Sequence, residues 1–319
     1  MSASPVSVNS ANSVNLEEWF ARSSYAAPDT IVVATSLTDL DFLVPQAMAE
    51  AASAYAELVF VHAITPDGAP SSTENFNPNK ADRDARLALE VVSRQVRSRG
   101  LFCKVVVRHG AVRDVVDEQI QECGAGRLLL GARAGAGSRP EAVRLGSSAR
   151  RLLSHQQIPV SCISPLVQAK AEASFVPHKI LYPLVQGSSQ RGYRSCHQEQ
   201  PLVQELSKYF RAQLIVLEQA KRECGTTDRL GSCLFSCPMG LWPQAERRTL
   251  PVVDAAAILG AAREYAADWI VLDRATALDP EPLMDEVEAV MAGATCPVLI
   301  VQSIAPVEEV LVPLSALPV

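Results

Sequence analysis

A glycine-rich stretch near the middle of this 319-residue chain holds residue types that bind anions. The apolar run Leu128–Gly131 ends in glycine, and further glycines follow at Gly135 and in Gly146–Ser148. Such a run is typical of a buried parallel strand that turns into a loop. Residues 149–155 are predicted to form a helix with serine as its N-cap. A glycine loop that leads into a helix N-terminus offers backbone N–H groups and a positive dipole end, so the stretch predicts a phosphate site.

The charges around this stretch favour the same interpretation. Between residues 127 and 151 one acid, Glu141, stands against six arginines: Arg127, Arg133, Arg139, Arg144, Arg150 and Arg151. The whole chain carries a net charge of −6, so a local excess of positive charge indicates an anion site. A solvated loop with scattered arginines is the alternative interpretation, because short glycine patterns recur by chance.

Length and composition limit the class of protein. The chain is long enough for two domains, and 48% hydrophobic with 20% charged residues is typical of a globular protein. No apolar run approaches the roughly 18 residues of a membrane helix, and the first residues lack the basic and apolar segments of a secretory signal. We therefore expect a cytoplasmic protein without a membrane partner. Its net acidity argues against a nucleic-acid partner.

The second half of the chain repeats the first. Strand-like segments around Ile180, Asp273 and Pro297 match those around Ile31, Gly131 and Pro159, in the same order and 138 to 149 residues apart. Matching segments at similar spacing indicate tandem copies of one fold. Short apolar strands that alternate with helices imply βαβ units. The predicted fold class is α/β, with two tandem three-layer α/β/α domains, each built on a five-stranded parallel sheet.

We expect four segments: a disordered tail with a short helix (1–28), a first domain (29–166), a second domain (175–305), and a C-terminal tail or edge strand (306–319). The second copy lacks the glycine loop, since Asp273 stands where the first has Gly131 and an acidic segment from Asp279 to Glu288 follows. The two copies are expected to pack as a pseudo-dimer within the chain, and a homodimer of chains stays open.

In the first half, residues 30–165 carry a series of segments that resembles the universal stress protein family. The series comprises the strand Ile31–Thr35, the helix Phe42–Ala56, the strand Glu57–Ala63, the strand Val105–Gly110 with the helix Val112–Cys123, the glycine loop, and Ile158-Pro159-Val160. The resemblance implies a Rossmann-like fold of the adenine nucleotide α-hydrolase type. It also implies a regulatory role in the stress response.

In ATP-binding members of that family the glycine loop holds the phosphates and ribose, and residues after the first two strands lie at the adenosine. The resemblance therefore implies ATP or another adenine nucleotide as ligand, bound by Gly131, Arg133, Gly135, Gly146, Ser147, Ser148, Ser36 and Ala63. Two features differ from the family. The loop is two residues longer, and Ser36 stands where the family usually has Asp, with Asp39 and Asp41 further on.

No catalytic residue is predicted. His62 and His109 lie at the ends of predicted strands, where a hydrogen bond to the backbone is the expected role. The sequence has no Gly-x-Ser-x-Gly elbow, no Walker lysine and no His-x-x-x-His pair. Besides nucleotide binding, a nucleotide-free scaffold that acts through protein–protein contacts stays open. An enzyme resembling an electron-transfer flavoprotein subunit is disfavoured, because the second half lacks a basic, glycine-rich segment.

The eight cysteines do not predict a metal site. Cys103, Cys162 and Cys296 lie in or beside predicted strands and are expected to be buried small hydrophobes. A second group, Cys224, Cys233 and Cys237, lacks the paired spacing of zinc ligands, and its role stays open.

Overall fold

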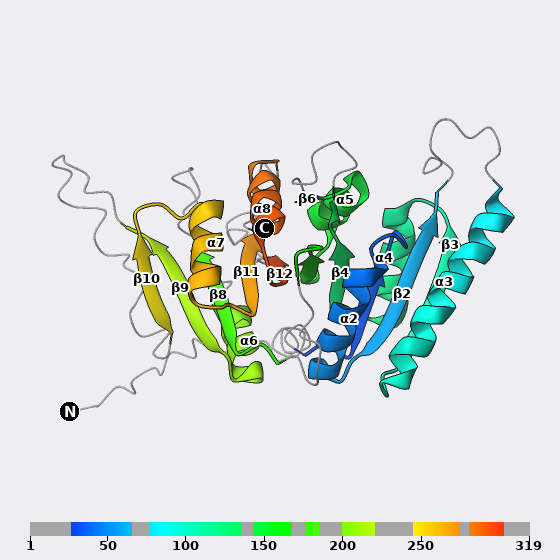
Figure 1. Ribbon diagram of the computed structural model, residues 1–319, viewed down its shortest axis with the longest axis horizontal. Helices are drawn as coiled ribbons and strands as arrows, with labels where there is room; N and C mark the ends of the chain where they lie inside the picture. Colours follow the sequence, from blue (N-terminus) through cyan, green and yellow to red (C-terminus); the bar gives the residue numbers. More distant parts are fainter. Residues whose placement is uncertain are drawn as a thin grey trace, which may run out of the picture.

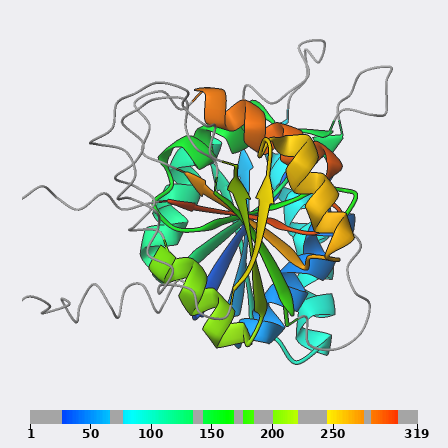
Figure 2. The ribbon, with the colours of Figure 1, turned by 90° about the vertical axis from the view of Figure 1, so that its left-hand side faces the viewer.

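The computed structural model describes residues 27–65, 77–134, 143–167, 176–184, 200–220, 245–274 and 281–302. These residues build one ten-stranded sheet with helices on both faces (Figures 1 and 2). The first half contributes β1 (Thr30–Ala34), α2 (Leu40–Ala54), β2 (Glu57–Ile64), α3 (Pro78–Ser98), β3 (Cys103–His109), α4 (Val112–Cys123), β4 (Arg127–Gly131), β5 (Arg133–Ala134), β6 (Val143–Arg144), α5 (Ser147–His155) and β7 (Val160–Ile163). The second half contributes β8 (Lys179–Leu184), α6 (Gln200–Phe210), β9 (Gln213–Gln219), β10 (Glu246–Leu250), α7 (Ala255–Glu264), β11 (Trp269–Arg274), α8 (Glu281–Gly293) and β12 (Val298–Gln302).

Both halves have the same topology. The strands run in the order β10-β9-β8-β11-β12-β7-β4-β1-β2-β3, so each half places its strands in the doubly wound order, with parallel pairing throughout. The predicted α/β class with five parallel strands in each half is thus confirmed. The short apolar strands are buried on both faces, as parallel strands between two helical layers must be.

The two halves meet along one antiparallel strand pair. Leu299 of β12 is the partner of Ser161 of β7, flanked by Val298 opposite Cys162 and Ile300 opposite Val160. The two five-stranded sheets therefore continue into each other as one ten-stranded sheet. The domain boundaries stay predictions, because the N-terminal tail, most of the linker, residues 306–319 and the Cys224–Cys237 group lie outside the described residues.

The apolar core is shared on one face of the sheet and divided on the other. A single cluster packs α4, α5, α7 and α8 against strands of both halves. On the opposite face, α2 and α3 form one cluster with the first half, and α6 forms a separate one with the second. None of the helices that the structure describes is long and apolar enough to cross a membrane.

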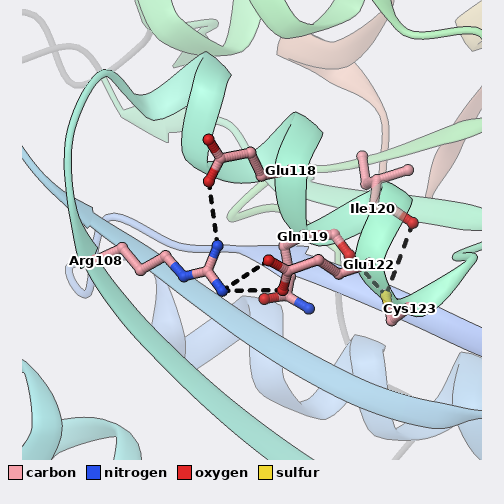
Figure 3. A network of polar contacts seen from close by, with 6 residues as sticks. All are labelled: Arg108, Glu118, Gln119, Ile120, Glu122 and Cys123. Atoms are coloured by element: carbon pink, nitrogen blue, oxygen red, sulfur yellow. Dashed lines mark hydrogen bonds and ion pairs between the residues drawn. The ribbon is translucent and has the colours of Figure 1, made fainter.

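The strand β3, last in the sheet order, is tied to α4 by a polar network (Figure 3). Arg108 Nη1 donates to Glu118 Oε2 at 3.1 Å, and Arg108 Nη2 donates to Glu122 Oε2 at 2.9 Å. Next to Glu122, the thiol of Cys123 donates to the carbonyl of Gln119 at 2.9 Å. The network holds α4 against β3. The short loop between them follows the carboxyl end of β3.

Candidate functional site

The strand order reverses between β1 and β4, which pair directly in the centre of the first half. In doubly wound folds, ligands bind in the crevice outside the carboxyl ends of the strands at such a reversal. The loop 35–39 follows β1 at this point, and Gly131 ends β4. The structure thus brings the end of the first strand and the start of the glycine loop to one edge of the sheet.

Asp39, which was not selected from the sequence as a site residue, lies buried at this edge of the sheet. Its side chain is buried and accepts a hydrogen bond from Thr35 Oγ1 at 2.5 Å and from the Ser36 N–H at 3.2 Å. Leu37, at φ 70°, directs its own N–H to Thr35 Oγ1 at 2.9 Å. The loop after β1 is therefore folded around the Asp39 carboxylate, which lies at the end of the strand although Asp39 comes five residues after Ala34 in the sequence.

Gly131 is a glycine because of Asp39. A Cβ at this position would lie 2.7 Å from Asp39 Oδ2 and 2.9 Å from Asp39 Cβ, closer than atoms can approach. The Asp39 carboxylate is held in place by two donors, so moving it away from a Cβ at position 131 would break those hydrogen bonds. The first glycine of the predicted phosphate loop is therefore required by packing inside the protein.

Gly146 differs from Gly131 in this respect. It is the N-cap of α5 with φ −64° and ψ 157°, a conformation that any residue adopts, and a Cβ there would meet no atom within 4 Å. Its carbonyl accepts the first helical bond, from Arg150 N at 2.9 Å. The predicted serine N-cap, directly before a helix over 149–155, was therefore wrong, since α5 begins two residues earlier. Ser147 and Ser148 lie exposed in the first turn, where backbone N–H groups have no helical acceptor.

The glycine loop begins and ends as a two-stranded hairpin. Arg133 of β5 pairs with Arg144 of β6, and Ala134 with Val143, in antiparallel register. This pairing holds the residues that follow Gly131 beside those that precede Gly146. Gly135 lies outside the described residues.

The two residues expected at the adenosine lie at the same edge. Ser36 is half-buried, with its Oγ 3.0 Å from Thr38 Oγ1, and Ala63 is half-buried near the end of β2. The neighbouring His62 places Nδ1 2.9 Å from the Thr35 carbonyl oxygen, so this histidine bonds the backbone as predicted. Its ring links the ends of β1 and β2.

The structure corrects the count of arginines at the site. Arg127 begins β4 and is buried in the sheet, where its Nη1 lies 3.4 Å from Glu50 Oε2. Four residues of extended strand separate it from Gly131, or about 13 Å, so its charge does not serve the anion site. Arg150 is held in an ion pair by Glu288 of α8. The local excess of positive charge read from the sequence is therefore smaller in three dimensions.

The described part of the chain contains no group of three or more His, Cys, Asp or Glu side chains that could hold a metal ion. Cys103, Cys162 and Cys296 are buried and form no disulfide, as expected. Burial raises the pKa of the Cys103 and Cys162 thiols, which keeps them protonated at neutral pH.

Comparison with known proteins agrees with the geometry. The family model described as the universal stress protein family matches residues 28–164. No curated protein sequence matches the chain significantly. Among solved structures, a universal stress protein from Archaeoglobus fulgidus DSM 4304 is similar with a TM-score of 0.61 at 15% identity, over 88% of this chain and 98% of that one.

Two structures from Pseudomonas aeruginosa are also similar, each with a TM-score of 0.53 and each over 88% of this chain. One is a putative universal stress protein from strain UCBPP-PA14, with 16% identity and 95% of its own length covered. The other is a functionally unknown protein from strain PAO1, with 14% identity and 94% covered. Over most of its length, the chain therefore has the fold of these proteins. The match to the family model places a universal stress protein domain at residues 28–164, in the first half of the chain.

Proposed function

We propose that the first half binds an adenine nucleotide such as ATP, and that the protein is regulatory rather than catalytic. The phosphates would lie on the backbone of Ser147 and Ser148 at the N-terminus of α5, with their hydroxyls as further donors. The adenosine would lie at the carboxyl ends of β1 and β2, near Ser36 and Ala63.

The observation that carries this proposal is Gly146. Its backbone conformation does not require glycine, and the protein leaves open space where a side chain would be. A helix N-cap is usually Ser, Thr, Asp or Asn, whose side chain bonds the first turn, yet α5 has no side-chain cap. A ligand anion that replaces the missing cap explains why this position has no side chain, since backbone and anion can then approach closely.

Asp39 determines which end of the glycine loop the phosphates would take. A carboxylate against Gly131 repels a phosphate at that end. The phosphates would therefore lie toward Gly146. Arg133, Gly135 and Gly131 would contact the nucleotide away from its phosphates. The chemistry of the site fits a nucleotide with its anionic end at α5 and its neutral end at β1.

Two substitutions at position 146 test the proposal. Gly146→Asp supplies a good N-cap, so the unfolding free energy should stay unchanged or rise by less than about 1 kcal/mol, while the carboxylate takes the place of the phosphate and abolishes ATP binding. Gly146→Asn, the matched uncharged cap, should weaken ATP binding less. Calorimetric titration with ATP, ADP and AMP, together with thermal unfolding, measures both effects.

Gly131→Ala is the contrasting variant. Its Cβ would collide with Asp39, so it should lower the unfolding free energy by roughly 1–3 kcal/mol. Undiminished ATP binding by Gly146→Asp would contradict a phosphate site at α5.

The second candidate function is a nucleotide-free scaffold. Two charges support the scaffold, because the Asp39 carboxylate lies against Gly131 and the Glu288 carboxylate already pairs with Arg150. Absence of binding heat for all three nucleotides, in a protein that unfolds cooperatively, would leave the scaffold as the supported function. A role in the stress response and a cytoplasmic location stay expectations from the family and the sequence.

A further inference from the structure

A helix of the second half lies beside the candidate phosphate site of the first. The helix α8 contacts β6, the strand that leads to Gly146, and Figure 1 shows α8 next to α5. On its buried side, Val287, Val290 and Met291 belong to the apolar cluster that both halves share. The position of α8 against α5 is therefore fixed by core packing.

A bidentate ion pair joins the two helices. Arg150 Nε donates to Glu288 Oε1 at 2.5 Å, and Arg150 Nη2 donates to the other oxygen of the same carboxylate. Asp285 lies 3.5 Å from Arg150 Nη2. The Glu288 side chain is only 15% exposed and that of Asp285 is 77% exposed, so Glu288 makes the stronger, partly desolvated contact.

Arg150 belongs to the turn of α5 that would hold the phosphates. Its backbone N–H bonds the carbonyl of Gly146, and Ser147 and Ser148 lie three and two positions before it in the same helix. The Glu288 carboxylate therefore places a negative charge of the second half on the side chain of Arg150, the fourth residue of α5. A bound phosphate and Glu288 would compete for the same cationic turn.

We propose that the second half restrains nucleotide binding through Glu288, and that a bound nucleotide weakens the contact between α8 and α5. This inference rests on the proposed function, because it concerns the same site. Coupling of two sites is reciprocal, so whatever Glu288 subtracts from nucleotide affinity the nucleotide subtracts from the Arg150–Glu288 pair. The second half, which lost its own loop, thereby acts as a built-in regulator of the first.

The connections of α8 give this release a route to the rest of the molecule. The helix leads into β12, β12 pairs with β7, and β7 follows α5 in the chain. A shift of α8 would therefore act at the strand pair that joins the halves.

Calorimetric titration of the full chain with ATP tests the inference. Glu288→Gln keeps the side-chain shape and removes the charge, and it should tighten ATP binding about tenfold, the value of one charge-assisted hydrogen bond. Asp285→Asn, on the same helix but exposed, should change the affinity less than about twofold. Glu118→Gln, the same substitution on α4 in the distant network at β3, should leave it unchanged.

The outcomes separate the two proposals. If neither the unsubstituted protein nor Glu288→Gln binds ATP, the proposed function fails and this inference fails with it. If both bind ATP with equal affinity, or if Glu288→Gln binds more weakly, nucleotide binding stands and the regulation by Glu288 is wrong. Thermal unfolding of each variant shows that it is folded under the titration conditions.

Hydrogen exchange gives a second, independent readout. Saturating ATP should speed amide exchange in α8 of the unsubstituted protein, and should change α8 much less in Glu288→Gln, where the contact is already weakened. Unchanged or slower exchange in α8 when ATP binds would overturn the proposed release.

Discussion

The two halves of the molecule share one topology and differ in chemistry where they meet. In the first half β1 and β4 pair through Ile31 and Arg127, and in the second half β8 and β11 pair through Ile180 and Trp269. Arg127 and Trp269 are thus structurally equivalent. They also contact each other, because the Arg127 guanidinium carbon lies 5.2 Å from the centre of the Trp269 ring.

The residues around this contact differ in the same way. Both α2 and α6 end in a left-handed residue, Tyr55 and Arg211, two positions before the next strand, so the two helices can be aligned. The alignment sets three polar residues of the first half against three leucines of the second: Gln46 against Leu202, Glu50 against Leu206, and Ser161 against Leu299. We call the junction of the two halves along β7 and β12 the seam. At the seam, the first half contributes a buried polar group and the second half contributes an apolar one.

The polar group is held together by Glu50. Its carboxylate accepts from Ser161 Oγ at 3.1 Å and lies 3.4 Å from Arg127 Nη1. Burial raises the pKa of Glu50 and lowers that of Arg127, because both groups lose their hydration. Two first halves paired in the same geometry would bring two Arg127 side chains together in the core, whereas Trp269 offers Arg127 an aromatic face. The seam therefore favours the pairing of a first half with a second half over the pairing of two first halves.

Removing one charge should break this arrangement most severely. Arg127→Met leaves Glu50 buried without its cation, which should lower the unfolding free energy by about 3–5 kcal/mol in denaturant titration. Replacing the whole polar group with apolar residues, as Gln46→Leu, Glu50→Leu, Arg127→Met and Ser161→Ala together, should restore most of that loss. A combined variant that is less stable than Arg127→Met would show that the polar group stabilises the protein beyond the pairing of its own buried polar atoms.

Thiol labelling sharpens the comparison, because two buried cysteines mark the seam. Cys162 lies in β7 and Cys296 just before β12, while Cys103 lies at the distant strand β3. Burial raises the pKa of Cys162, so at pH 8 it should react with iodoacetamide roughly tenfold or more slowly than an exposed thiol. Arg127→Met should speed labelling of Cys162 and Cys296 together, as peptide mapping by mass spectrometry would show. Equal acceleration at Cys103 would mean global unfolding instead of opening of the seam.

Much of this fold could be predicted because its signals are local. Apolar runs such as Leu128–Leu130, bounded by glycine or proline, identify buried strands, and the helix Val112–Cys123 was predicted with the bounds that the structure shows. The short strand β10 and the helix α8 were not predicted. The sequence of β10, Glu246–Leu250, is polar and exposed, and the acidic start of α8 suggested only a segment that repels phosphate.

The candidate site was harder to predict because its charges are arranged by the fold. Arg127 counted as part of a basic stretch, yet it begins a strand whose other end carries the site. Asp39 was noticed only as an acid after Ser36, since nothing in the spacing shows that its carboxylate turns back under the strand. The partner of Arg150 is 138 positions away in sequence, on a helix of the other half. Counting charges along the chain cannot find such pairs.

The network at β3 provides the smallest effect and completes the comparison with the buried pair of the seam. Arg108 contacts Glu118 and Glu122, but all three side chains are at least one-third exposed, so solvent screens their attraction. Arg108→Gln should leave the midpoint of thermal unfolding unchanged within error at physiological salt, although it removes two ion pairs where Arg127→Met removes one. Raising the salt concentration should not widen the difference, since exposed pairs weaken with salt. A loss of stability comparable to that of Arg127→Met would show that the edge of the sheet, and not the seam, limits the stability of the first half.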